Sequence, residues 1–267
     1  MSTIASEIAP VITAQPSANP IIRCSSLQKW YGAVHALKDV DFHAERGEVI
    51  GLVGDNGAGK STLITQICGE LRPDKGSILF DGRDVTRLKA HLRARLGLGR
   101  TFQITQLCQD FTALENILLA IETRAGGSFD MLSNPRRNGT VMAQALERLA
   151  EVGLGEQAER RVATLGHGER RQLEIAVALA RQPKLLLLDE PMAGLGPEES
   201  VAMTRLLAAL KGQYAILLVE HDMDAVFALA DRISVLVYGR VIFTGTVDEI
   251  RTHPEVRAAY LGGEPAC

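Results

Sequence analysis

The 267-residue sequence predicts an α/β fold with a mostly parallel core sheet. From residue 184 onward, aliphatic runs of strand length alternate with longer segments of helical periodicity, which is typical of parallel strands joined by crossover helices. Upstream, another buried strand, Glu48–Val53, leads through a glycine-rich segment into a helical one. These observations predict a parallel sheet with helices on both faces.

The N-terminal part is expected to begin with a flexible tail, residues 1–20, in which Ser, Thr, Ala and Pro show no periodicity. Between Ile21 and Phe42, apolar segments alternate with polar residues, which predicts an antiparallel β region. A helix is expected at Lys60–Gly69, and the glycine ends it. Lys75-Gly76 predicts a turn before the next strand, Ser77–Phe80.

Residues about 104–175 differ in character and predict an inserted α-helical subdomain. Helical periodicity falls at Thr112–Ile121, Val141–Val152 and Glu169–Arg181, and a polar loop, Ala125–Thr140, separates the first two. The alternating pattern then resumes with a strand at Lys184–Leu188, a helix at Pro197–Leu210, a strand at Ala215–Val219, a helix at Met223–Ala230 and a hairpin at Ile233–Thr244.

The composition argues against several classes of protein. A formal net charge of -3 does not fit a strongly basic nucleic-acid binder, although it leaves room for a local basic patch. The aliphatic runs fall short of the roughly 20 apolar residues of a membrane-spanning helix. The N-terminus lacks the basic start and apolar core of a signal peptide, so a membrane role is expected to need a partner. The four cysteines form no CxxC pair, which argues against zinc or a disulfide framework and fits a reducing cytoplasm.

A phosphate-binding pattern lies between the strand at 48–53 and the helix at 60–69. The residues that fit GxxxxGK[ST] are Gly54, Asp55, Asn56, Gly57, Ala58, Gly59, Lys60 and Ser61. Glycines let several backbone N–H groups point at one phosphate, and the following helix adds the positive end of its dipole. Lys60 is expected to reach the β- and γ-phosphates, Ser61 to hold Mg²⁺ and Thr62 to add a phosphate contact. The alternative is a glycine turn before a helix, but the strand–loop–helix context favours ATP binding.

Two carboxylates follow the aliphatic strand at Leu185–Leu188. The carboxyl ends of parallel strands face the ligand crevice, so Asp189 is expected to hold Mg²⁺ through water. Glu190 is expected to polarise the attacking water as general base. Acidic residues also end many strands at protein surfaces, and the phosphate loop upstream is what favours the catalytic interpretation.

With these motifs the sequence resembles the ATP-binding subunits of ABC transporters over about residues 21–263. The segment Leu165–Gln172 resembles the family signature, usually LSGGQ, and it precedes a helix and the acidic strand. The resemblance implies that Gly166, His167, Gly168 and Glu169 of one subunit close on the γ-phosphate held by another. N–H groups at a helix start bind anions, which gives this a physical basis. Alone, the segment would indicate only a glycine turn that caps a helix.

The resemblance assigns roles to three more residues. Tyr31 would stack on the adenine ring. Gln103, in the RTFQ sequence at 100–103, matches the glutamine that contacts Mg²⁺ and water and relays the state of the site to the membrane subunit. His221 follows a strand as the switch histidine of the family does, and would contact the γ-phosphate. A lone strand aromatic or histidine is more often structural, so these roles depend on the resemblance.

The sequence departs from the family pattern at three positions. Gly166 stands where the signature usually has Ser, which removes a hydroxyl contact but keeps the N–H group. Gly196 replaces the usual Asp of the D-loop, which removes the side chain of the standard contact across the dimer. Asp55 replaces a common Pro. The residues assigned to catalysis are all present, so an active site is expected.

Within the family, the sequence resembles the LivG-type subunits of branched-chain amino-acid importers. The stretches that carry this resemblance are Gly99–Gln103, Leu114–Ile117, Gly168–Ala176, Val219–Met223 and Val256–Gly262. It implies a bacterial importer with two ATPase subunits, two integral-membrane permeases and a periplasmic solute-binding protein. The chain would lie in the cytoplasm against the inner face of the plasma membrane and pair with a second copy or a companion ATPase. Related systems carry urea, amides or aromatic acids, and the solute is selected outside this chain.

Two other classes compete with this interpretation. A soluble ABC ATPase that acts on nucleic acid or in translation would usually carry a long coiled-coil insertion or a duplicated cassette, and neither is present, so no nucleic-acid partner is expected. A non-catalytic nucleotide-binding regulator is opposed by the intact Lys60, Asp189, Glu190 and His221.

Overall fold

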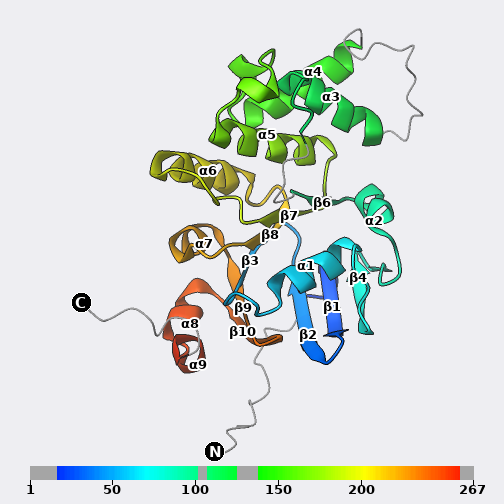
Figure 1. Ribbon diagram of the computed structural model, residues 1–267, viewed down its shortest axis with the longest axis vertical. Helices are drawn as coiled ribbons and strands as arrows, with labels where there is room; N and C mark the ends of the chain where they lie inside the picture. The colour runs from blue at the N-terminus through cyan, green and yellow to red at the C-terminus, as the bar shows by residue number, and fades with distance from the viewer. Residues whose placement is uncertain (1–16, 102–106, 125–137, 259–267) are drawn as a thin grey trace, which may run out of the picture.

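The computed structural model describes residues 17–101, 107–124 and 138–258 (Figure 1). Its larger sheet has six strands in the order β10-β9-β3-β8-β7-β6. These strands are β3 (Val49–Val53), β6 (Leu98–Arg100), β7 (Leu185–Asp189), β8 (Ala215–Val219), β9 (Arg232–Val237) and β10 (Arg240–Gly245). Neighbouring strands are parallel except β9 and β10, which form an antiparallel hairpin. The predicted α/β class with a mostly parallel sheet is confirmed.

Side chains of the central strands alternate between two apolar cores. In β8, Ile216 and Leu218 belong to one core, and Leu217 and Val219 belong to the other. The first core is closed by α5 (His167–Ala180), α6 (Pro197–Leu210) and α7 (Met223–Leu229). Strands that are buried on both faces appear in sequence as continuous aliphatic runs, which is why they were predictable.

The second face of the sheet is covered by α1 (Lys60–Cys68) together with a smaller antiparallel sheet, rather than by helices alone. The smaller sheet has the order β2-β1-β4-β5. Its strands are β1 (Ile22–Tyr31), β2 (Val34–Ala44), β4 (Lys75–Phe80) and β5 (Arg83–Asp84). The antiparallel region expected near the N-terminus is therefore present, and it supplies part of the main core.

The turn predicted at Lys75-Gly76 is wrong, because both residues lie in β4. Gly76 has φ 89° and lies against β1 where the pairing of the strands is irregular. A Cβ atom at position 76 would lie 2.5 Å from the carbonyl oxygen of Ser25. The glycine permits this close approach between strands and does not reverse the chain.

Three helices gather on one side of the sheet, at the top of Figure 1: α3 (Ala113–Arg124), α4 (Gly139–Glu151) and α5. Leu114, Leu149 and Leu173 come from one helix each and share a single core with the sheet. These helices lie where periodicity predicted them, with ends shifted by a few residues. Most of the predicted loop at 125–140 lies outside the described residues. Several short elements were not predicted: α2 (Ala90–Leu96), β5, β6, η2 (Gly155–Gln157), η3 (Val162–Thr164), α8 (Val247–Thr252) and α9 (Pro254–Val256).

A buried arginine joins α2 to the end of α1. Arg93 has no exposed side-chain surface and donates to the carbonyl oxygens of Gln66 and Ile67, both at 2.7 Å. It also donates to Leu88 and Thr86 within the segment that leads into α2. The last carbonyl groups of a helix lack partners within the helix, so this guanidinium completes the C-terminus of α1.

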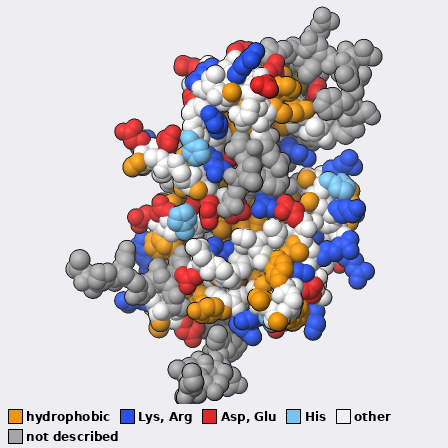
Figure 2. Space-filling model, in the orientation of Figure 1, with side chains coloured by type: hydrophobic (Ala, Val, Ile, Leu, Met, Phe, Trp, Pro, Cys, Tyr) orange, Lys and Arg blue, Asp and Glu red, His pale blue; other side chains and the backbone are white. Residues whose placement is uncertain are grey.

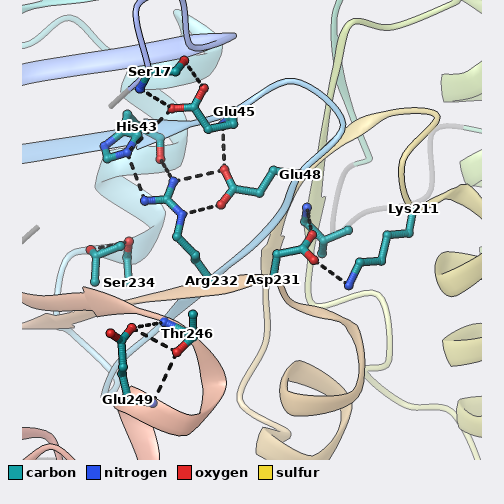
Figure 3. A network of polar contacts seen from close by, with 12 residues as sticks. Ser17, His43, Glu45, Glu48, Lys211, Asp231, Arg232, Ser234, Thr246 and Glu249 are labelled. Carbon is teal, nitrogen blue, oxygen red and sulfur yellow. Dashed lines mark hydrogen bonds and ion pairs between the residues drawn. The ribbon is translucent and has the colours of Figure 1, made fainter. Parts of the chain in front are cut away.

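A polar network ties together the amino ends of β3 and β9, the end of the sheet opposite to the phosphate loop (Figure 3). The guanidinium of Arg232 donates to Glu48 Oε2 at 3.1 Å and lies 3.0 Å from Nε2 of His43. Next to it, Asp231 accepts from the backbone of Val49 at 2.9 Å. These bonds fix the edge from which the central strands start.

Figure 2 shows Lys and Arg side chains gathered over α2. Exposed cations in and before this helix include Arg83, Arg87, Lys89 and Arg95. This is the kind of local patch that a net charge of -3 leaves possible.

Across the described ranges, the helices are too short or too polar for any of them to span a membrane.

Candidate functional site

The predicted catalytic residues follow three strands that lie next to one another. In the sheet, β8 lies between β3 and β7, and all three run in parallel. The phosphate loop follows β3, the acidic pair Asp189-Glu190 ends and follows β7, and Glu220-His221 follows β8. The amide of Glu190 donates to the carbonyl oxygen of Val219 at 2.8 Å, which extends the pairing to the loops. One edge of the sheet therefore brings these motifs together.

The phosphate loop adopts a conformation that requires glycine. Gly54 has φ 152°, and a Cβ atom there would lie 2.1 Å from the carbonyl oxygen of Leu236 in β9. Gly59, at φ 110°, begins α1 as its N-cap. The start of α1 has no capping side chain and no acidic residue in its first turn. Its N–H groups and the positive end of its dipole are thus available to an anion.

Lys60 folds back over the loop. Its Nζ donates to the carbonyl oxygens of Gly54 at 2.5 Å and Asp55 at 3.0 Å. Burial lowers the pKa of Lys60, and the nearby carboxylates of Glu190, Asp55 and Asp189 act in the opposite direction. The ammonium group is therefore held close to the acidic pair, where it can neutralise phosphate charge.

Asp189 is almost buried at the end of β7, with 6% of its surface exposed. Burial raises the pKa of its carboxyl group, while Arg100 opposes that shift. The guanidinium of Arg100 lies 3.3 Å from Asp189 Oδ2 and 2.8 Å from Glu70 Oε2, so it bridges the two carboxylates. This arginine was not predicted as a site residue, and the only signal for it in the sequence is its place three residues before Gln103. Next along the chain, Glu190 has φ 50°, an uncommon backbone conformation for glutamate.

The residues present fit a divalent cation bound together with phosphate. Ser61 offers an exposed hydroxyl in the first turn of α1, and Asp189 offers a carboxylate whose ionised form a cation would favour. The described part of the chain contains no cluster of three or more His, Cys, Asp or Glu side chains suited to a metal. Mg²⁺ usually takes one or two protein ligands plus phosphate oxygens and water, and this donor set is of that kind.

A buried glutamate next to His221 was also missed. Glu220 is 1% exposed and accepts hydrogen bonds from the amides of Met192 at 2.8 Å and His221 at 3.2 Å. Burial raises the pKa of Glu220. Its carboxylate joins the loop after β7 to the loop after β8. The imidazole of His221 is 68% exposed, with Nδ1 at 3.7 Å from Glu220 Oε2, so it is accessible at the edge of the site.

Tyr31 ends β1 and is 51% exposed, with the ammonium group of Lys29 5.9 Å from its ring. The hairpin of β1 and β2 approaches the phosphate loop, since a Cβ atom at Gly59 would lie 2.9 Å from the carbonyl oxygen of Ala36. Tyr31 therefore lies on the hairpin that approaches the loop. Gln103 lies outside the described residues.

The segment Gly166–Glu169 forms the start of α5. The amide of Gly168 donates to Glu199 in α6, and Nε2 of His167 lies 3.4 Å from the carbonyl oxygen of Ala193. Within one chain, this segment is therefore joined to the loop that follows Glu190.

Comparison with known proteins identifies the family. A family model described as "ABC transporter" matches residues 37–193, and another, described as "Branched-chain amino acid ATP-binding cassette transporter", matches residues 240–266. The chain is 37% identical over 252 residues to the high-affinity branched-chain amino acid transport ATP-binding protein BraF of Pseudomonas aeruginosa, covering 92% of this chain and 99% of BraF. The corresponding LivG protein of Escherichia coli K12 is 35% identical over the same coverage.

Solved structures that resemble this chain belong to the same family. The ADP conformation of MJ1267, an ATP-binding cassette of an ABC transporter, superposes with a TM-score of 0.80 at 29% identity, covering 91% of this chain and 99% of MJ1267. The ATP-binding cassette MJ0796, described as dimeric and bound to ADP and Pi after hydrolysis, has a TM-score of 0.72 at 25% identity, covering 85% and 98%. The chain belongs to the ABC transporter family as an ATP-binding subunit, and it is a nucleotide-binding ATPase.

Proposed function

We propose that this chain is the ATP-hydrolysing subunit of a bacterial ABC importer that takes up branched-chain amino acids or a related small polar solute. The observation that supports the solute class is the C-terminal match at residues 240–266 to the branched-chain amino acid cassette family. It accompanies similarity to BraF that extends over 92% of the chain. The alternative is that the same ATPase subunit serves an importer of urea, amides or aromatic acids.

Phosphate binding is assigned to the loop of residues 54–61 and to Thr62. Backbone N–H groups of the loop and the start of α1 would surround the phosphates, and Lys60 would neutralise their charge. Ser61, Asp189 and Gln103 would hold Mg²⁺, which supplies charge neutralisation of the phosphates when it is bound. Arg100, 3.3 Å from Asp189, favours the ionised form of that carboxylate against the effect of its burial.

Hydrolysis is assigned to the loops after β7 and β8. Glu190 would accept a proton from the attacking water as general base. His221 would contact the γ-phosphate from the neighbouring strand end, and Glu220 fixes the backbone that presents it. Tyr31 would stack on the adenine base.

The other half of the site is assigned to Gly166, His167, Gly168 and Glu169 of a second ATPase subunit, either another copy or a companion chain. Closure of the pair would move two integral-membrane permeases through Gln103 and the helical subdomain of about residues 104–175 in a cassette spanning residues 21–263. The chain would act from the cytoplasmic, inner face of the plasma membrane, with a periplasmic solute-binding protein on the far side and no nucleic-acid partner.

Glu190→Gln tests the hydrolysis step. The amide cannot take the proton of water, so we expect ATP turnover to fall at least about a hundredfold, within the usual contribution of general-base catalysis. ATP should still bind, and the variant should accumulate as an ATP-bound dimer in sedimentation velocity. Turnover at the wild-type rate would show that Glu190 is not the base.

Uptake in vesicles tests the solute. The chain would be reconstituted with its permeases and binding protein, and ATP-dependent accumulation of labelled leucine would be compared with that of urea. We expect leucine uptake that disappears with Glu190→Gln. Uptake of urea alone would move the assignment to the alternative importers.

A further inference from the structure

The helices α5 and α6 start in the same way. Each has a glycine at its N-cap, Gly166 and Gly196, and glycine has no side chain to cap the helix. In each case the glutamate three residues later folds back. Gly166 N donates to Glu169 Oε2 at 2.7 Å, and Gly196 N donates to Glu199 Oε2 at 3.0 Å. In both helices the glutamate at N3 accepts from the N-cap amide, which is one of the two hydrogen bonds of a capping box.

Glu199 differs from Glu169 because its second carboxylate oxygen reaches the other helix. Oε1 of Glu199 accepts from the amide of Gly168, in the first turn of α5, at 3.2 Å. The contact is close: a Cβ atom at position 168 would lie 2.8 Å from this oxygen. One carboxylate therefore joins the start of α6 to the segment Gly166–Glu169.

This arrangement conflicts with anion binding at the start of α5. The amide of Gly168 is one of the N–H groups that would receive the partner's γ-phosphate in the proposed function. A single N–H cannot donate fully to a carboxylate and a phosphate at once, and two anions at one helix start repel each other. The start of α1, where the chain's own phosphate loop binds nucleotide, carries no acidic residue in its first turn.

We propose that Glu199 is a positioning residue that occupies the phosphate position at the start of α5 in the separate subunit, and that ATP-driven pairing requires its carboxylate to leave the Gly168 amide. This rests on the proposed two-subunit motor. The Glu199 side chain is exposed, so it has room to turn into solvent while α6 stays in place. The contact sets how much ATP is needed before two subunits close.

The test compares Glu199→Gln with Glu198→Gln, both in the Glu190→Gln background that retains ATP. Glu198 is the exposed neighbour of Glu199 in the same helical turn and serves as the matched control. The dimer fraction would be measured by sedimentation velocity as ATP is raised at fixed protein concentration. We expect Glu199→Gln to lower the ATP concentration for half-maximal pairing about fivefold, since a charged acceptor holds an N–H more strongly than a neutral one. Glu198→Gln should leave it unchanged.

Two further measurements separate this role from a merely structural one. The ATP affinity of the separate subunit should be the same for both glutamine variants. Exchange of the Gly168 amide proton, followed by NMR without nucleotide, should be faster in Glu199→Ala than in Glu198→Ala. If both glutamine variants pair at the same ATP concentration, the proposed role of Glu199 is wrong, whereas the proposed two-subunit ATPase is unaffected. If the Glu190→Gln chain pairs in ATP neither with a second copy nor with its companion ATPase, the two-subunit motor fails, and the role of Glu199 fails with it.

Discussion

At the scale of single residues, glycines of the phosphate loop differ in what they require. Gly54 has no space for a side chain, because a Cβ atom would lie 2.1 Å from the carbonyl oxygen of Leu236. Gly57 has φ 81° but nothing within 4 Å of an added Cβ atom. Position 54 requires glycine because of the packing against β9, whereas position 57 favours glycine only through its backbone conformation.

Gly54→Ala and Gly57→Ala should therefore differ in stability. We expect Gly57→Ala to lower the free energy of unfolding by about 1–2 kcal/mol, the cost of a left-handed conformation for an L-residue. Gly54→Ala should cost about 3 kcal/mol, because the loop must also move away from β9. Urea unfolding followed by circular dichroism, without nucleotide, would measure both. Equal losses would contradict the packing argument.

At the scale of elements, α1 depends on a residue from another helix. The N-terminus of α1 is left open for phosphate, whereas its C-terminus is closed by Gly69 and by the guanidinium of Arg93 from α2. A Cβ atom at Gly69 would lie 2.6 Å from Nε of Arg93, so the glycine also makes room for the arginine. The helix that carries Lys60 and Ser61 is thus anchored from its far end.

Arg93→Met tests this anchor. It keeps most of the buried volume but leaves the carbonyl groups at the end of α1 without their donor, so the free energy of unfolding should fall by about 3 kcal/mol. Arg95→Met, at an exposed position of the same helix, should change it by less than about 0.5 kcal/mol. Chemical denaturation would measure the free energy of unfolding of both variants. A small loss in Arg93→Met would mean that water replaces the guanidinium as the donor to the end of α1.

At the scale of the whole molecule, one end of the central sheet carries the candidate site and the other end is held by a polar network. The carboxyl ends of β3, β7 and β8 carry the site, with its strained Glu190 and buried Asp189. The amino ends of β3 and β9 are held by Arg232, Glu48 and His43 (Figure 3). Rigidity at one end allows the loops at the other end to hold an unfavourable geometry.

The network at the amino ends predicts a pH dependence. Burial, helped by the charge of Arg232, lowers the pKa of His43 from 6.5. The unfolded chain then binds a proton that the folded chain does not, so stability falls as the pH drops below about 6.5 and levels off below the folded pKa. Urea unfolding at pH 7.5, 6.5 and 5.5 should show this loss in the wild type and a smaller one in His43→Gln. Parallel curves would exclude His43 as the cause.

Local patterns in the sequence predict the class of fold and the motif-bearing loops. Continuous aliphatic runs of strand length, such as Leu185–Leu188, indicate strands buried on both faces, and the glycine pattern before Lys60 indicates a phosphate-binding loop. These features depend on neighbouring residues in the chain, which is why the sequence alone predicts them. The short elements α2 and β6 lack such a local pattern and were missed.

Contacts between distant parts of the chain depend on how the strands and helices pack, and the sequence does not predict them. Arg100 reaches Asp189 across 89 positions of the chain, and Glu199 reaches Gly168 across 31. Arg93 finds the end of α1, and Glu220 supports the loop after β7. Each of these contacts comes from one charged side chain, whose partner is set by how strands and helices pack rather than by its neighbours in sequence. The phosphate loop was predictable because its chemistry is local, whereas the residues that hold and restrain the site were not.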